Sequence, residues 1–378
     1  MNLFQVYSLL DMEPVKAQGA YLWDKQGEEY LDFYGGHAVI SIGHTHPHYV
    51  EKITDQLSKI GFYSNAVING LQVELAEKLG ELSGYEDYEL FLCNSGAEAN
   101  ENALKLASFT TGRERILAMK GAFHGRTSMA VAVTDNPKIQ APVNKSDKVS
   151  FVELNDIEAM RAELSRGEYA ALIIEPIQGV NGIKVATVEY LQAAREACKE
   201  YGTLLIMDEI QAGCGRSGRY FAHQWADIKA DIITLAKGIA NGFPVGAVMI
   251  SPEIPAWKGM LGTTFGGSHL ACAAAIAVAD VMKSENLVAN AEKMGEAIIN
   301  GIKGVSGIKD IRGRGLMIGI DLSVPQAEFR RLLREKYHIM TGLSGEWTLR
   351  LLPPLMITQK EVDRFVEAFR LTAEELGM

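Results

Sequence analysis

Residues 170–236 contain the pattern that decides the fold: AALIIEP (170–176), VEYLQAAREACKEY (188–201), LLIMDE (204–209) and IITLA (232–236). Short apolar runs alternate here with a longer amphipathic run, which is the pattern of strand–helix–strand units. The short runs are apolar on both faces, as parallel strands are when helices cover both sides of their sheet. The stretch therefore predicts an α/β fold whose ligands bind where the strands end.

The same alternation begins earlier in the chain and stops before its end. YELFLC (88–93) precedes a helical run at 97–107, and VSFVEL (149–154) precedes another at 156–164. We expect a large α/β domain over residues 46–289. The C-terminal third and the hairpin pattern YLWDKQGEEYLDF (21–33) differ in character, and they predict a smaller α+β domain built from residues 1–45 and 290–378.

Composition narrows the class of ligand. The 378 residues carry 47 acidic and 37 basic side chains without charge runs, which disfavours nucleic acid or an anionic membrane as the main partner. The four cysteines lie far apart with no CxxC spacing, so neither a disulfide framework nor a thiolate metal site is predicted. The N-terminus has no leader pattern. We expect a cytoplasmic protein that binds a small molecule, not a metal.

Lys237 is the first candidate for chemistry. It directly follows the apolar run IITLA, in a segment that turns polar and rich in glycine. Burial near a cleft favours the neutral amine of a lysine, and a neutral amine can attack a carbonyl. By position alone, a solvated lysine after a strand is the more common case.

Asp208 strengthens that candidate. It ends the apolar run LLIMD, where a carboxylate is costly unless a cation or several donors face it. A protonated pyridine nitrogen is one such cation. The two-residue period of a strand puts Ile210 on the same side, where it would pack on a ring face, and Gln211 follows as a neutral donor. The alternative is that Asp208 only caps the following turn.

Ser95, Gly96 and Ala97 predict an anion site. They join an apolar strand to a helix, so free backbone N–H groups and the helix dipole point toward an anion, and Gly96 allows a close approach. A plain helix cap explains the same residues. Thr263 and Thr264, which precede two glycines, offer further donors.

Together these motifs resemble a known family. The chain is similar, over nearly its whole length, to the class III pyridoxal-phosphate aminotransferases, and within them to the acetylornithine and ornithine aminotransferases. The resemblance implies a fold-type I transferase with a mainly parallel seven-stranded sheet, pyridoxal 5'-phosphate as cofactor and a homodimer. The blocks that carry it are DFYGGHAV (32–39), NSGAEANENALKLA (94–107), AFHGRT (122–127), IIEPIQG (173–179), MDEIQAGCGRSG (207–218), LAKGIANGFPVGAV (235–248), GTTFGGSHLA (262–271) and LRLLPPL (349–355).

The resemblance also implies roles for single residues. The lysine matching Lys237 carries the cofactor as a Schiff base, and the aspartate matching Asp208 keeps its ring nitrogen protonated. Phe123 matches the residue that stacks on the ring, opposite Ile210. The cofactor-binding set implied in this way is Ser95, Gly96, Ala97, Phe123, Asp208, Glu209, Ile210, Gln211, Lys237 and, from the other subunit of the dimer, Thr264.

Two arginines match substrate-binding positions. Arg126 would bind a substrate carboxylate and Arg350 the α-carboxylate of glutamate or 2-oxoglutarate, since a planar fork suits carboxylates. Thr263, Glu175 and His37 complete the expected substrate set. The resemblance implies transfer of the terminal amino group of N2-acetylornithine to 2-oxoglutarate in arginine biosynthesis. The alternatives are succinylornithine, ornithine or 4-aminobutyrate as donor, or a relative that does not transaminate, such as an aminomutase, a decarboxylase or an inactive paralogue.

Two positions depart from the family pattern. Val180 stands where ornithine aminotransferase-like chains commonly have a glutamate that pairs with the arginine matching Arg350. His37 stands where related enzymes have an aliphatic or aromatic residue. We expect both to change substrate preference more than cofactor binding.

Three histidines at alternate positions, His44, His46 and His48, would face one way on a strand and are the remaining metal candidates. Pro47 interrupts that strand, and no carboxylate or cysteine is adjacent in sequence. A loop packed near the domain junction is the favoured interpretation.

Overall fold

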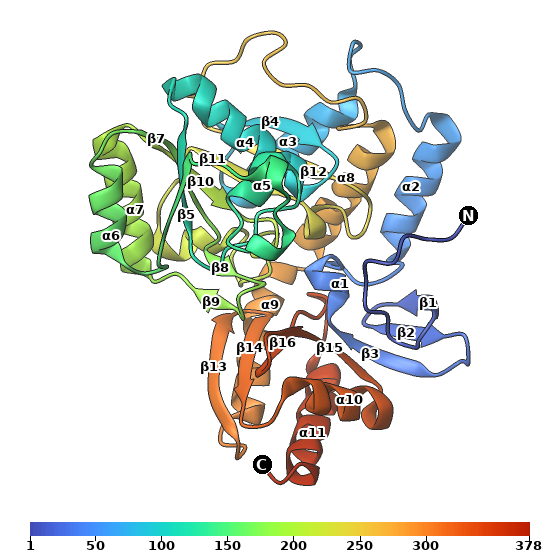
Figure 1. The fold of residues 1–378 in the computed structure, drawn as a ribbon. Coiled ribbons are helices and arrows are strands. Elements are labelled where there is room, and N and C mark those ends of the chain that lie inside the picture. Colours follow the sequence, from blue (N-terminus) through green and yellow to red (C-terminus); the bar gives the residue numbers. More distant parts are fainter.

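Two seven-stranded sheets organise the chain, and the computed structural model describes all of its residues, 1–378. In Figure 1 one sheet lies above the other, and both ends of the chain contribute to the lower one. The first sheet belongs to the middle of the sequence. The second is shared between residues 14–33 and 308–351.

The first sheet is mainly parallel, as the sequence predicts. Only β12 runs antiparallel to both of its neighbours, β11 and β4. The strands β11, β10, β7, β5 and β6 are parallel to one another. The strand order is β4 (Glu89–Cys93), β12 (Gly246–Ile250), β11 (Ile232–Leu235), β10 (Leu204–Asp208), β7 (Tyr169–Ile174), β5 (Arg115–Met119) and β6 (Val149–Val152).

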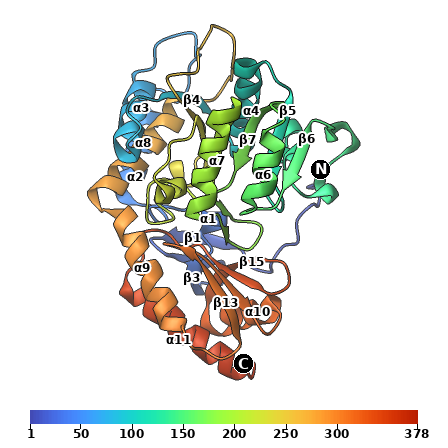
Figure 2. The same ribbon diagram turned by 90° about the vertical axis from the view of Figure 1, so that its left-hand side faces the viewer.

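Apolar cores cover this sheet on both faces. Along β10, Leu205 and Met207 belong to one core and Ile206 to the other, because successive side chains of a strand point to opposite faces. Helix α4 covers the second of these faces, and Figure 2 shows α6 and α7 side by side over the sheet. The helices around the sheet are α2 (Pro47–Lys59), α3 (Gly70–Ser83), α4 (Gly96–Thr111), α5 (Ser128–Ala132), α6 (Ile157–Leu164), α7 (Val188–Tyr201) and α8 (His269–Ser284).

Local signals set the ends of these helices. The Ser95 side chain accepts a hydrogen bond from the N–H of Glu98 at the start of α4, and Thr187 does the same for Tyr190 at the start of α7. Both helices end at a glycine in the left-handed conformation, Gly112 for α4 and Gly202 for α7. The apolar helix α8 is packed in the core, and no helix of the chain has the length and hydropathy of a membrane span.

The second sheet is mainly antiparallel, with β3 and β15 as its parallel pair. The hairpin predicted at residues 21–33 is confirmed, since β2 pairs with β3 around Gln26 and Gly27. Figure 2 shows α9 and α11 along one side of this sheet. Its strands are β1 (Pro14–Gln18), β2 (Tyr21–Asp24), β3 (Glu29–Phe33), β15 (Ile339–Ser344), β16 (Thr348–Leu351), β14 (Met317–Leu322) and β13 (Ile308–Arg314), and its helices are α9 (Leu287–Ile302), α10 (Gln326–Tyr337) and α11 (Gln359–Glu375).

The two sheets have separate cores, and short elements connect them. The core of the second sheet contains Phe33, Ile298, Phe329 and Phe365. Domain boundaries at residues 45/46 and 289/290 stay a prediction. The connecting elements are α1 (Gly35–Ala38), the two-stranded ribbon β8 (Ile177–Gln178) with β9 (Lys184–Val185), and short 3-10 turns at Pro137–Ile139, Pro142–Asn144, Ala222–Ala226 and Lys237–Ile239.

Candidate active site

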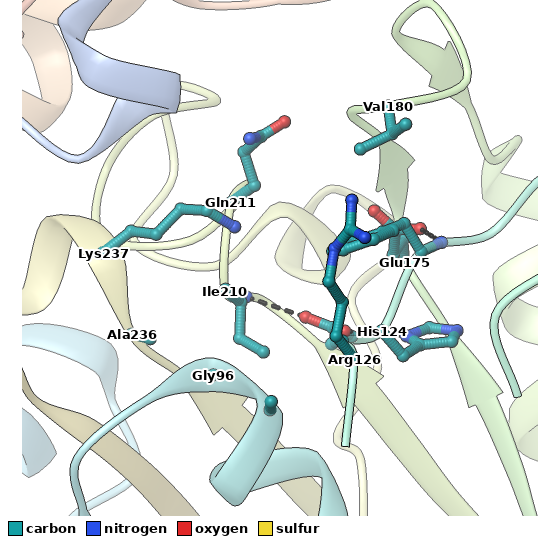
Figure 3. Close-up of a pocket in the computed structure, with 13 residues that line it drawn as sticks. Gly96, His124, Arg126, Glu175, Val180, Ile210, Gln211, Ala236 and Lys237 are labelled. Atoms are coloured by element: carbon teal, nitrogen blue, oxygen red, sulfur yellow. Dashed lines mark hydrogen bonds and ion pairs between the residues drawn. The ribbon is translucent and has the colours of Figure 1, made fainter. Parts of the chain in front are cut away.

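A cavity of about 290 Å³ lies at the carboxyl ends of the parallel strands in the first sheet. Its walls come from the start of α4 and from the loops after β5, β7, β10 and β11 (Figure 3). These segments meet because parallel strands end at the same edge of a sheet. The cavity brings together most of the predicted site residues, namely Gly96, Ala97, Phe123, Arg126, Glu175, Asp208, Ile210, Gln211 and Lys237.

Asp208 is the buried carboxylate of the cavity, with 3% of its surface exposed. Its Oδ2 atom accepts a hydrogen bond from Asn100 Nδ2 at 2.8 Å and lies 2.7 Å from His124 Nδ1. Its Oδ1 atom accepts from the N–H of Ile210 at 3.0 Å. A buried carboxylate needs such donors. The side chain is therefore held in one orientation while still lining the cavity.

Sequence reasoning missed the residues that hold Asp208. Thr234 donates its hydroxyl to Asn100 Oδ1 at 2.8 Å, and Asn100 also donates to the carbonyl of His124 at 2.7 Å. Two signals were available. Asn100 lies one helical turn after Gly96 and so faces the same side, and His124 directly follows the predicted stacking residue Phe123.

Lys237 reaches the cavity from the loop after β11, as Figure 3 shows. Its Nζ atom has no hydrogen-bond or ion-pair partner. Burial lowers the pKa of this lysine, while the nearby Asp208 and Glu175 carboxylates oppose the shift and Arg350 adds to it. Its backbone φ is +51°, in the left-handed region that non-glycine residues adopt uncommonly. The site therefore presents an unpaired amine whose neutral form is favoured more than that of a solvated lysine.

The start of α4 forms the anion-binding side of the cavity. Gly96 and Ala97 line it, and the first N–H groups of a helix have no acceptor within the helix. A Cβ atom on Gly96 would lie 2.9 Å from Ile210 Cδ1. The absence of a side chain at Gly96 therefore lets this helix end pack directly against Ile210.

Glu175 holds two loops of the cavity together. Its Oε1 atom accepts from the N–H of Phe123 at 2.8 Å, and its Oε2 atom accepts from the N–H of Gly179 at 3.4 Å. Burial raises the pKa of this carboxyl to about 7, with the nearby Asp208 carboxylate adding to the shift and His124 opposing it. The folded protein therefore favours the protonated form up to about neutral pH.

This shift predicts a pH-dependent effect of Glu175→Gln on stability. A carboxyl whose pKa is raised on folding destabilises the folded state as pH rises from the ordinary value, 4.5, to about 7. Glutamine cannot ionise. The stability of the variant relative to the natural protein should therefore rise between pH 4.5 and 7 and stay level above it, which urea unfolding of the cofactor-free protein at pH 5, 6, 7 and 8 would measure. A pH-independent difference would contradict the assignment.

The two predicted arginines are placed differently. Arg126 lines the cavity, and Figure 3 shows its guanidinium in the space between Val180, Glu175 and Gln211. Arg350 lies behind that wall on β16, with 5% of its surface exposed. Its Nη1 atom donates to the carbonyl of Gly179 at 2.7 Å, while its buried Nε atom has no partner and no carboxylate pairs with it.

Several predicted site residues lie outside the cavity. The side chain of Glu209 points to the other face of β10, where its Oε1 atom lies 2.7 Å from His223 Nδ1 in the buried interior. Ser95 caps α4. Thr263 does not line the cavity, and its hydroxyl oxygen accepts hydrogen bonds from Asn94 Nδ2 and from the N–H of Gly266. Thr264 is exposed.

His37 lies near the rim of the cavity. Its carbonyl accepts a hydrogen bond from Gln211 Nε2 at 3.1 Å, so its backbone supports a lining residue although its ring does not line the wall.

The three histidines of residues 44–48 do not converge. Residue 47 begins helix α2, so the strand that would align them is absent. No group of side chains in the chain has the arrangement of a metal site. Each histidine pairs with a different carboxylate: His44 with Asp32 at 2.8 Å, His46 with Glu285 at 2.9 Å and His48 with Asp280 at 3.0 Å.

The chain is similar to known proteins in both sequence and fold. The chain is similar to the acetylornithine aminotransferases of Archaeoglobus fulgidus (40% identical, covering 97% of this chain and 96% of that protein) and Methanosarcina mazei (38%, covering 97% and 92%). Among solved structures it resembles that of the acetylornithine aminotransferase from Elizabethkingia anophelis (TM-score 0.87, 31% identical, 98% and 95% covered). It also resembles an ornithine aminotransferase from Toxoplasma gondii (TM-score 0.91, 29% identical, 99% and 93% covered), described with partial occupancy of PLP at its active site. The model of the family Aminotransferase class-III matches residues 6–372, and the chain belongs to that family.

Proposed function

We propose that this chain is a pyridoxal-phosphate-dependent aminotransferase that moves the terminal amino group of N2-acetylornithine to 2-oxoglutarate. The products are N-acetylglutamate 5-semialdehyde and glutamate, a step of arginine biosynthesis. One observation carries the proposal: the unpaired amine of Lys237 and the buried carboxylate of Asp208 line one cavity at a helix N-terminus. Relatives similar over nearly the whole chain are named acetylornithine aminotransferase, which supports this choice of donor.

The residues of the cavity fit pyridoxal phosphate. The start of α4 suits the phosphate, the Asp208 carboxylate suits the ring nitrogen, and the amine of Lys237 suits the aldehyde. The buried Gln211 Oε1 atom has no hydrogen-bond partner, which is consistent with a polar ligand beside it. When bound, this cofactor supplies an electron-withdrawing ring that stabilises negative charge on the substrate carbon.

Lys237 is the residue we assign to proton transfer. Its lowered pKa favours the neutral Nζ, which can take a proton from the substrate carbon and return it on the way to product. Asn100 and His124 keep Asp208 in its orientation throughout. The protein therefore supplies a base, the Lys237 amine, and a carboxylate held in one orientation, that of Asp208.

Arg126 and Arg350 are the residues we assign to substrate carboxylates. Both are without a carboxylate partner of their own, and a guanidinium binds a carboxylate through two parallel hydrogen bonds. The Gly179 carbonyl occupies Nη1 of Arg350, which leaves the unpartnered Nε edge of the guanidinium for a ligand. Two such sites suit an acceptor with two carboxylates, as 2-oxoglutarate has.

Replacing Val180 with glutamate should test the role of Arg350. Val180 lines the cavity and Arg350 donates to the carbonyl of the residue before it, so a carboxylate at position 180 would compete with the acceptor for the guanidinium. We expect KM for 2-oxoglutarate to rise by roughly tenfold, the effect of about 1.4 kcal/mol. Val180→Gln, of equal size without charge, is the control. Equal KM values in the glutamate and glutamine variants would contradict this role.

We propose that the enzyme is a homodimer whose second copy completes the site. Thr264, the predicted phosphate contact from the other subunit, is exposed here and outside the cavity of its own chain. The N-terminal segment also exposes large apolar side chains, as surfaces that bind a partner do. These are Leu3, Phe4, Val6, Tyr7 and Leu9. Sedimentation analysis of the natural protein and of Thr264→Ala should show a dimer in both, with weaker cofactor binding in the variant only.

We also propose that the enzyme works in the cytoplasm. Its four cysteines are buried and unpaired. Burial raises the pKa of the Cys93 and Cys272 thiols to about 12, so both stay protonated at neutral pH. Unpaired thiols are usual where glutathione and thioredoxin keep proteins reduced.

A panel of donors tests the proposed reaction. The purified enzyme would be incubated with pyridoxal phosphate, 2-oxoglutarate and one of N2-acetylornithine, N2-succinylornithine, ornithine or 4-aminobutyrate. We expect glutamate to form fastest with N2-acetylornithine. Glutamate formation with none of the four would reject the aminotransferase function, and a faster rate with another donor would reassign the substrate.

A further inference from the structure

Helix α1 is a single turn of left-handed helix. Its four residues, Gly35, Gly36, His37 and Ala38, have φ values of 55°, 57°, 65° and 65°, and ψ is 52° at Gly36 and 38° at His37. L-amino acids with side chains rarely adopt this region, and runs of it are rarer still. A strained conformation persists only where its surroundings impose it, and it is concentrated at functional sites.

Contacts at both ends impose this turn. At its entry, Asp32 Oδ1 accepts from the N–H of Gly35 at 2.8 Å, and its Oδ2 atom lies 2.8 Å from His44 Nε2. A Cβ atom on Gly35 would lie 2.5 Å from the Leu352 carbonyl, so no side chain fits there. Beyond its exit, Ser41 donates its hydroxyl to the carbonyl of Gly238 at 2.7 Å. The turn is thereby tied to the loop that begins with Lys237.

The turn aims the His37 ring at one partner. His37 Nε2 lies 2.5 Å from the Tyr34 hydroxyl, and the two rings meet edge to face with centroids 4.7 Å apart. The His37 carbonyl accepts from Gln211 in the cavity wall. Its Nδ1 atom makes no hydrogen bond. The ring is therefore held at Nε2, and its Nδ1 edge has no partner within the chain.

Burial favours the neutral form of both rings. Burial lowers the pKa of His37, and the neighbouring basic groups Arg350 and Lys237 add to that shift. Burial also raises the pKa of Tyr34, although Arg350 opposes it. A neutral His37 that accepts from the Tyr34 hydroxyl at Nε2 carries its proton on Nδ1. The free edge is then a hydrogen-bond donor.

We propose that His37, held by Tyr34 in this left-handed turn, distinguishes acylated from free ornithine by donating a hydrogen bond from Nδ1 to the acyl carbonyl of the donor. This inference rests on the proposed function. Free ornithine carries an α-ammonium where the acylated donor has a neutral amide. That ammonium is repelled by the Arg350 guanidinium, while a carbonyl oxygen accepts from the imidazole N–H.

Variants of the turn distinguish the effect of the His37 side chain from the effect of the turn's backbone conformation. His37→Gly removes the ring and relaxes the backbone, whereas His37→Asn keeps a donor on a residue that tolerates positive φ. Tyr34→Phe releases the ring, and Ala38→Gly relaxes the turn while keeping the His37 side chain. For each, kcat/KM would be measured with N2-acetylornithine and with ornithine, together with the glutamate half-reaction and the visible absorbance of the bound cofactor.

We expect His37→Gly to lower kcat/KM for N2-acetylornithine by roughly tenfold, the range of one hydrogen bond, with little change for ornithine. Tyr34→Phe should show a smaller loss, His37→Asn a partial rescue and Ala38→Gly the natural ratio of the two donors. The glutamate half-reaction and the absorbance should stay unchanged, which a merely structural role would not predict.

Two results would overturn the inference. If the natural enzyme uses N2-acetylornithine and His37→Gly keeps the natural donor ratio, or loses both donors equally, the role of His37 is wrong while the proposed function stands. If the natural enzyme uses neither donor, the proposed function fails and this inference fails with it.

Discussion

Replacing Lys237 with alanine should abolish turnover, lowering kcat by at least about 10³-fold, as loss of a catalytic nucleophile and base does in other enzymes. The structure explains why no other residue can replace it. Its Nζ is the one lysine amine that lines the cavity, and burial holds its pKa below the ordinary value. Steady-state assays with N2-acetylornithine and 2-oxoglutarate, together with the visible spectrum of the bound cofactor, measure the effect.

Two further variants make the Lys237 test specific. Lys237→Arg introduces a basic side chain of similar length that stays charged at neutral pH and cannot act as a neutral amine, so it should be as inactive as the alanine variant. Lys258→Ala removes an exposed lysine and should leave turnover and spectrum unchanged. Full activity and an unchanged spectrum in Lys237→Ala would contradict the assignment of Lys237 as the catalytic lysine.

Replacing Asp208 with asparagine should lower kcat/KM by roughly 10²–10³-fold, the usual effect of removing one preorganised electrostatic contact. The substitution keeps the shape of the side chain but removes its negative charge. It also places an amide where Oδ2 now accepts from Asn100 and faces His124. We therefore expect weaker binding of pyridoxal phosphate, measured by titrating the cofactor-free protein.

Asp231 offers a matched control for Asp208. It directly precedes β11, at the amino ends of the parallel strands and away from the cavity. There it accepts from the N–H of Leu205 at 2.7 Å and pairs with Arg195 at 2.9 Å. Asp231→Asn should lower the free energy of unfolding without changing kcat/KM. The role of Asp208 would be contradicted if its asparagine variant kept more than about a tenth of the activity, a difference of about 1.4 kcal/mol.

Much of the site could be predicted from local sequence, because residues that follow parallel strands lie together at the carboxyl ends of those strands. Asp208 and Lys237 each follow an apolar strand, and parallel strands β10 and β11 bring both to one edge. Gly96 was predicted from a strand-to-helix turn for a similar reason. The strand period also accounts for Glu209: successive residues of a strand point to opposite faces, so the residue next to Asp208 points away from the cavity.

By itself, the sequence determined the α/β class, the mainly parallel sheet and the lysine–aspartate pair, since apolar periodicity and chain direction act over a few residues. Only the tertiary structure decided the rest. The Arg350 contact with Gly179 joins positions 171 residues apart, and the tie from Ser41 to Gly238 spans 197. Such contacts depend on how separate sheets pack, and no local preference encodes them. The left-handed turn at His37 exists for the same reason: His37 and Ala38 disfavour it by themselves, and distant neighbours impose it.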